Sequence, residues 1–129
     1  MRSPLKTALI ADLVSALEAE RATVAAAQKL SQEGATHEDS RSEGDKDMRA
    51  TEASYIARGQ ALRVEALDAD LARVHAMAAR DFGDEDPIAI GALVEVVNAD
   101  GEAMSLLFVA PAGGGAKLAR GADKVTVVT

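Results

Sequence analysis

Two long stretches of this 129-residue chain carry apolar residues at alternating steps of three and four, and they limit its fold more than any other feature. In the first stretch these positions are Ile10, Leu13, Leu17, Val24 and Ala27, with Glu20 filling the gap. In the second they are Ala53, Ala57, Val64, Leu67, Leu71, Val74 and Ala78, and the polar Gln60 also falls on this spacing. This spacing is typical of a coiled-coil seam. Because a short polar segment joins the two stretches, they are expected to pack as an antiparallel hairpin.

The ends of the helices are predicted from capping signals. Ser3-Pro4 is typical of a helix start, and Gly34 is expected to end the first helix at about Glu33 as a left-handed C-cap. A loop is expected from residue 35 to about 47, and the second helix from there to Arg80. Residues 1–80 therefore form a predicted hairpin domain, with an acidic tip at about 34–50.

The pattern changes after residue 80 from a helical period to that of strands. Residues 81–87, "DFGDEDP", are predicted to be a linker. A β-hairpin is expected from Leu93–Val97 and Met104–Val109, with a turn around Asp100-Gly101. "AGGGAKLARGAD" is predicted to be a flexible loop, and "KVTVVT" a third and last strand. The fold class is therefore expected to be α+β, with residues 88–129 as a small β-domain.

Composition excludes several classes of function. The net charge of −7 disfavours a broad surface for binding nucleic acid, so no sequence-specific DNA recognition is expected. The absence of cysteine excludes disulfides, thiol catalysis and cysteine-bound zinc. No apolar stretch reaches the roughly 20 residues of a membrane span, so no membrane partner is expected and a cytoplasmic protein is predicted.

A dense group of acidic residues lies between the two helical stretches. Six carboxylates fall within fifteen residues: Glu38, Asp39, Glu43, Asp45, Asp47 and Glu52. One interpretation is a solvated polar loop, which any helical hairpin needs. The other is a site for Mg²⁺, which takes oxygen ligands and needs only one or two protein carboxylates when another molecule supplies the rest. An exposed tip cannot enclose a substrate, so a free-standing enzyme is not expected.

The order of these features resembles the bacterial Gre family of transcript cleavage factors. Residues 88–109, "IAIGALVEVVNADGEAMSLLFV", are similar to the start of the family's C-terminal domain, whose pattern is Ile/Val-x-x-Gly-x-x-Val-x-Val followed by a hairpin. The segment "EGDKDMRATEASY" resembles the family's tip, which reads Gly-Asp, two residues, then Glu-Asn-Ala-Glu-Tyr. The resemblance implies an FKBP-like β-domain. Because the family continues beyond a strand like "KVTVVT", the resemblance leads us to expect a partial domain here.

The resemblance also implies a function. Gre proteins insert their coiled coil into the secondary channel of RNA polymerase, where tip acids help to hold a second Mg²⁺. The polymerase then cuts the 3′ end of a backtracked RNA, which the factor meets only indirectly. Here Asp45, in Gly44-Asp45, is the candidate for positioning the shared Mg²⁺, and Asp47 and Glu43 are candidates for assisting it. The spacing to Tyr55 is three residues longer than in the family, and Met48 stands where the family has its second acid.

Further contacts with the channel are expected from residues around the tip, namely Glu38, Asp39, Arg41, Arg49, Glu52 and Tyr55. Two other functions stay open. One is a regulator that binds the secondary channel without stimulating cleavage, which the altered spacing favours. The other is a coiled-coil interaction module unrelated to transcription.

Overall fold

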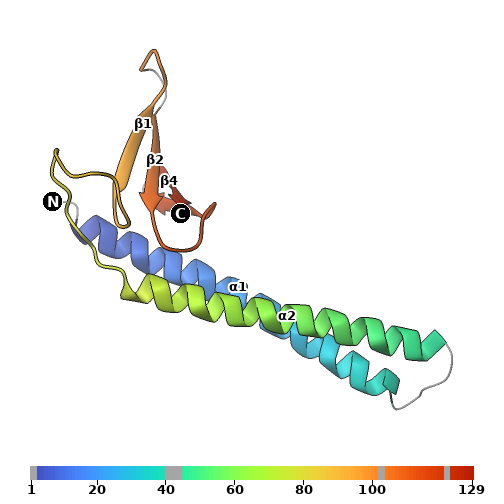
Figure 1. Ribbon diagram of the computed structural model, residues 1–129. Helices are drawn as coiled ribbons and strands as arrows, with labels where there is room; N and C mark the ends of the chain where they lie inside the picture. The colour runs from blue at the N-terminus through green and yellow to red at the C-terminus, as the bar shows by residue number, and fades with distance from the viewer. Residues whose placement is uncertain (1–2, 40–44, 102–103, 121–122) are drawn as a thin grey trace. The chain divides into compact units, whose positions relative to one another are not determined.

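The structure is a computed structural model that describes residues 3–39, 45–101, 104–120 and 123–129 (Figure 1). It contains helices α1 (Ser3–Asp39) and α2 (Asp45–Ala76) and strands β1 (Leu93–Val97), β2 (Met104–Val109), β3 (Lys117–Arg120) and β4 (Asp123–Val128). The predicted α+β class is confirmed. None of the helices in the described part combines the length and apolar character that crossing a membrane requires.

The chain divides into two compact units. The sheet unit contains residues Met1–Leu17 and Asp70–Thr129, and the helical unit contains Glu18–Ala69. Each helix therefore contributes one end to the sheet unit and the rest of its length to the helical unit.

The predicted ends of both helices are wrong. α1 continues through Gly34 to Asp39, so Gly34 is not its C-cap. Gly34 has a helical backbone and open space around it, and a glycine inside a helix costs only about 1 kcal/mol relative to alanine. α2 begins at Asp45 and ends at Ala76, four residues before the predicted end at Arg80.

Tertiary contacts hold the chain just after α2 in a non-helical course. The Nζ atom of Lys6, a side chain only 1% exposed, donates a hydrogen bond of 2.5 Å to the carbonyl oxygen of Arg80. The same ammonium lies 4.7 Å from the ring centroid of Phe82, and the Arg80 guanidinium lies 4.3 Å from that centroid. These contacts fix residues 80–82 against the start of α1.

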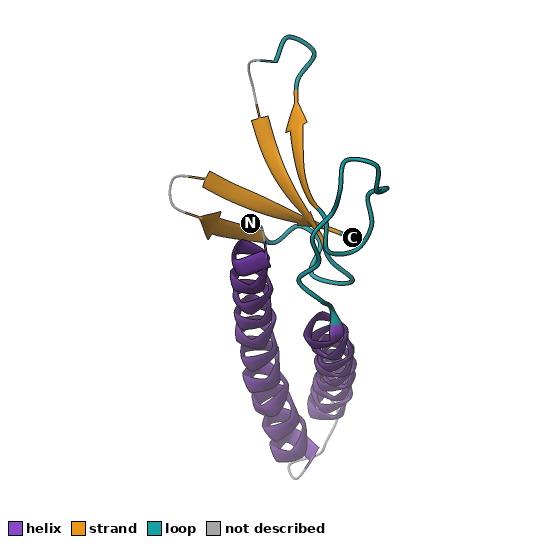
Figure 2. Ribbon diagram, turned by 90° about the vertical axis from the view of Figure 1, so that its left-hand side faces the viewer, coloured by secondary structure: helices purple, strands orange, loops and turns teal. Residues whose placement is uncertain are grey.

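The sheet has four strands in the order β1-β2-β4-β3, which Figure 2 shows in orange. β1 and β2 form the predicted antiparallel hairpin, with Leu93 opposite Phe108. β4 then pairs parallel with β2 and antiparallel with β3. The prediction of a flexible loop over "AGGGAKLARGAD" is wrong in part, because β3 lies inside it and adds a fourth strand.

The core of the sheet unit follows the alternation of side chains along the strands. Val125 and Val127 of β4 point to the same face, together with Phe108 of β2, and none of the three is exposed to solvent. Leu118 of β3 is also buried, at 4% exposure. From α1, two leucines complete this core, Leu9 and Leu13, both at 0% exposure.

The glycine-rich segment before β3 passes close to α1. At Gly113 a Cβ atom would lie 2.7 Å from Cδ1 of Leu13, and the backbone φ is +85°. Both conditions require glycine, because side chains rarely adopt this φ and carbon atoms do not approach so closely. An ion pair between Arg120 and Asp12 joins β3 itself to α1.

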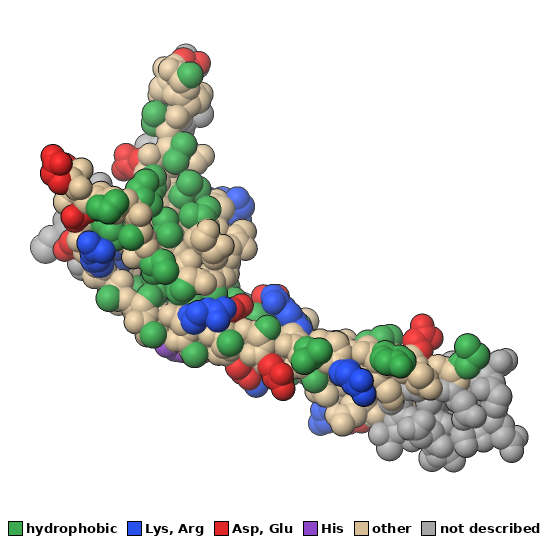
Figure 3. All heavy atoms as spheres, in the orientation of Figure 1, with side chains coloured by type: hydrophobic (Ala, Val, Ile, Leu, Met, Phe, Trp, Pro, Cys, Tyr) green, Lys and Arg blue, Asp and Glu red, His purple; other side chains and the backbone are tan. Residues whose placement is uncertain are grey.

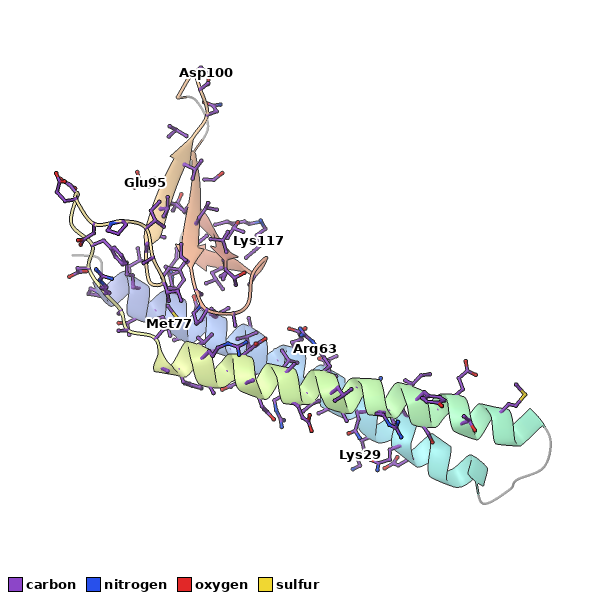
Figure 4. All side chains as sticks on the ribbon, viewed as in Figure 1. Lys29, Arg63, Met77, Glu95, Asp100 and Lys117 are labelled. Atoms are coloured by element: carbon purple, nitrogen blue, oxygen red, sulfur yellow. The ribbon has the colours of Figure 1, made fainter. Side chains whose placement is uncertain are left out.

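In the helical unit, α1 and α2 run side by side in opposite directions (Figure 1). Two ion pairs join them: Arg21 Nε to Asp68 Oδ1 at 2.5 Å, and Arg63 Nη2 to Glu20 Oε1 at 2.6 Å. Arg63 is labelled in Figure 4. The expected seam positions of α2 that lie in this unit are buried or half-buried, with Leu67 at 0% exposure and Ala57 at 8%.

Replacing Gly113 with alanine tests the close approach to α1. We expect Gly113→Ala to lower the free energy of unfolding by roughly 2–4 kcal/mol, from backbone strain and from overlap with the fully buried Leu13. Gly101→Ala is the matched control, since Gly101 also has a positive φ, +75°, but open space around it. It is expected to cost about 1 kcal/mol, from strain alone. Urea unfolding measures both, and equal losses would contradict the overlap.

Candidate functional site

The acidic residues predicted as a site gather where α1 ends and α2 begins. Glu38 and Asp39 form the last two positions of α1, and Asp45 and Asp47 lie in the first turn of α2. Six residue steps separate Asp39 from Asp45, so their Cα atoms are no more than about 22 Å apart. The fold therefore brings acids from both helices to one end of the helical unit.

The structure describes only part of this predicted site. Glu43 and Arg41 lie outside the described residues. For Glu38, Asp39, Asp45, Asp47 and Arg49 the structure places the helical backbone, but their side chains also lie outside the described part. Among the side chains that are described, no three acids or histidines form a group able to hold a metal ion.

The helix termini affect these acids differently. The N-terminus of a helix carries a partial positive charge, which favours the carboxylates of Asp45 and Asp47 at the start of α2. The C-terminus of α1 carries a partial negative charge, which disfavours the carboxylates of Glu38 and Asp39.

Glu52 and Tyr55 are the two predicted contact residues whose side chains the structure describes. Both are exposed on α2, Tyr55 at 66%. The guanidinium carbon of Arg58 lies 6.0 Å from the Tyr55 ring centroid, at the outer limit of a cation–π contact.

An exposed apolar surface on α2 was not predicted. Met48, Ile56 and Leu62 are 74%, 50% and 60% exposed. Met48 and Ile56 line an open hollow of about 610 Å³ together with Tyr55, and Thr51 and Glu52 complete its lining. Figure 3 shows hydrophobic side chains gathered on this part of α2. The sequence did carry a signal, because Met48, Tyr55 and Leu62 are spaced by seven and lie outside the predicted seam.

The ion pairs set the electrostatics of the same unit. Arg21 holds Asp68 with two hydrogen bonds, from Nε to Oδ1 at 2.5 Å and from Nη2 to Oδ2 at 3.2 Å. The hydrogen bonding by the guanidinium lowers the pKa of the Asp68 carboxyl, and the same interaction raises the pKa of Arg21. Both side chains remain about half exposed, so solvent weakens the interaction.

The pH dependence of stability tests this pair. Because folding lowers the pKa of Asp68, the pair stabilises the folded state above the unfolded carboxyl pKa near 3.9, and this contribution is lost as the pH falls through the folded-state pKa. We expect Asp68→Asn to lower the melting temperature at pH 7 by a few degrees at most. This difference should begin to shrink below about pH 3.9 and vanish only below the lower folded-state pKa of Asp68.

Glu65→Gln serves as the control, since Glu65 is an exposed acid of the same helix with no ion pair to another described residue. Thermal melts of both variants from pH 7 to pH 3 give the comparison. If Asp68→Asn lowered the melting temperature equally over this pH range, the Arg21–Asp68 pair would not be the source of the stabilisation.

Comparison with known proteins finds no matching family model, no matching curated protein and no matching solved structure.

Proposed function

We propose that this protein is a Gre-type transcription factor that binds RNA polymerase in the cytoplasm, inserts its coiled coil into the secondary channel and stimulates cleavage of backtracked RNA. The observation that carries the proposal is the meeting of acids from two antiparallel helices at one end of the helical unit, with five residues between α1 and α2. A pair of helices is slender enough to enter a channel, and the acids at the end where α1 stops and α2 starts are the ones that it would present to another active site.

In this proposal Asp45 helps to position a Mg²⁺ ion that the polymerase mostly coordinates. Asp47 or Glu43 assists it, and hydrolysis takes place in the polymerase's own active site. The donor set fits the ion, since Mg²⁺ prefers oxygen ligands and is commonly bound through one or two carboxylates. When bound, the ion supplies charge stabilisation and an activated water.

The sheet unit supports the resemblance at one motif. The Gly of the family pattern is Gly91, which has a φ of +97° and donates a backbone hydrogen bond of 2.8 Å to Val109. A Cβ atom at this position would lie 3.4 Å from the carbonyl oxygen of Ala78. Glycine therefore has a physical reason to stand there: it lets the first strand start close to the segment that follows α2. We propose that residues 88–129 form an FKBP-like β-domain that contacts the polymerase.

A second candidate is a secondary-channel regulator that does not stimulate cleavage. Met48 stands where the family has its second acid, and it is 74% exposed on α2. A thioether is a poor ligand for a hard cation, so this position does not assist in holding Mg²⁺. Such a regulator would occupy the channel and modulate nucleotide entry instead.

Cleavage by a backtracked RNA polymerase complex tests both candidates. We expect the intact protein, with Mg²⁺ and RNA labelled at its 3′ end, to release short labelled fragments. Asp45→Ala should reduce their rate of release at least about tenfold, the loss expected when a transition-state interaction of about 1.4 kcal/mol is removed. Glu65→Ala, on the same helix but away from α1's end, should leave the rate unchanged.

The other outcomes are equally informative. Uncut RNA, with the protein still bound to the polymerase and slowing elongation, would favour the non-cleaving regulator. An absence of polymerase binding would contradict both candidates and leave the interaction module unrelated to transcription.

A further inference from the structure

The exposed apolar face of α2 forms a straight stripe. Met48, Tyr55 and Leu62 follow one another at intervals of seven, which is two helical turns, so they lie along one line of the helix. All three are at least 60% exposed, and Ile56 beside them is 50% exposed. We call Met48, Tyr55, Ile56 and Leu62 the α2 stripe. The stripe is separate from the inner positions Ala57 and Leu67, which are buried in the helical unit.

Charges and small residues are arranged symmetrically about the centre of the stripe. Glu52 comes three residues before Tyr55, and Arg58 three residues after it. Neither makes an ion pair with another residue in the described part of the chain. Thr51 and Gly59 lie four residues to either side, and the site of a Gly59 Cβ has open space around it.

We infer that the α2 stripe binds a second copy of this chain, with the two α2 helices antiparallel about a twofold axis at Tyr55. Such an interface is isologous, so each residue meets the one equally far on the other side of the axis. Met48 then meets Leu62 of the second copy, and Glu52 meets Arg58. Gly59 lies opposite Thr51, where its missing side chain lets the helices approach. A parallel arrangement in the same register would place like charges together.

The hollow on α2 fits this register. Its lining runs from Met48 to Ile56, and the symmetry places Leu62 of the second copy over the Met48 end. The Tyr55 rings of the two copies meet at the axis, where offset stacking of aromatic rings contributes about 0.5–1.5 kcal/mol beyond the buried area. One helix face is smaller than the roughly 800 Å² per partner of a standard interface. The dimer is therefore expected to be weak, with a Kd on the order of micromolar.

This inference does not rest on the proposed function. It does use Glu52 and Tyr55, which the proposal assigns to the polymerase channel, so the dimer and the channel-bound protein would exclude one another. The tests below contain no polymerase, and their failure would leave the proposed function standing.

Cysteine cross-linking tests the register, since the chain has no cysteine of its own. Met48→Cys and Leu62→Cys are made separately, one carrying an affinity tag, and oxidised alone and mixed. We expect a disulfide-linked dimer of mixed composition from the mixture. Either variant alone should cross-link poorly, because the thiols of the two copies in its dimer lie about 21 Å apart along the helices, beyond the reach of a disulfide. Stronger cross-linking of Met48→Cys with itself than in the mixture would overturn the antiparallel register.

Charge reversal tests the pairing between Glu52 and Arg58. By sedimentation equilibrium, Glu52→Arg and Arg58→Glu should each raise the dimer Kd at least about tenfold, because each places like charges together twice in the interface. The double variant should return Kd to near the original value. A double variant as weak as the single variants would overturn the pairing.

An exposed leucine on the other helix provides the matched control. Leu62→Glu should leave the protein monomeric, whereas Leu30→Glu on α1, where Leu30 is 70% exposed, should leave Kd unchanged. Circular dichroism of each variant checks that the helices persist. The inference would be overturned if the unsubstituted protein were still monomeric at about 100 μM. Equal effects of Leu62→Glu and Leu30→Glu on the dimer Kd would also overturn it.

Discussion

The burial of Leu9 and Leu13 of α1 in the sheet unit is the interaction on which the rest of that unit depends. Leu9 and Leu13 have no exposed surface, and the chain before β3 reaches Leu13 only because Gly113 has no side chain. The strands alone would form a thin sheet with little apolar surface to bury. The N-terminal end of α1 thus supplies core to a unit whose strands lie more than seventy residues later, and Lys6 fixes the chain between them through the Arg80 carbonyl.

The helical unit is stabilised differently, and its possible functions follow from that. Its described interior is small and aliphatic, with Ala57 and Leu67 as its buried side chains, and exposed ion pairs such as Arg21–Asp68 add little each. Such a pair of helices stays slender and leaves the outer face of α2 exposed. We propose different partners for this face and for the acidic end of the unit. In these proposals the acids at the helix ends help to hold a metal ion shared with RNA polymerase, and the α2 stripe binds another helix.

The sequence predicted the elements whose signals are local and repeated. The steps of three and four predicted both helices, and alternation around Asp100-Gly101 predicted β1 and β2 at the residues where they occur. β3 was missed because three glycines precede it and four residues carry little alternation. For the candidate site, the sequence placed the acids between two helices, and the structure puts Asp45 and Asp47 within α2. The α2 stripe was not predicted, because the three-four spacing identifies the opposite face of α2 as its apolar face.

The sequence by itself determined the helical and strand periods, the acidic segment between the helices and the turn at Asp100-Gly101, because each depends on neighbouring residues along the chain. Only the tertiary structure decided where α2 stops, since the Arg80 carbonyl accepts a hydrogen bond from Lys6, which lies more than seventy residues earlier in the chain. It also decided that Lys117–Arg120 becomes a strand, because β4 offers an edge and Leu118 gains a buried place in the core. Contacts between residues far apart in sequence carry no local signal, so only the folded chain reveals them.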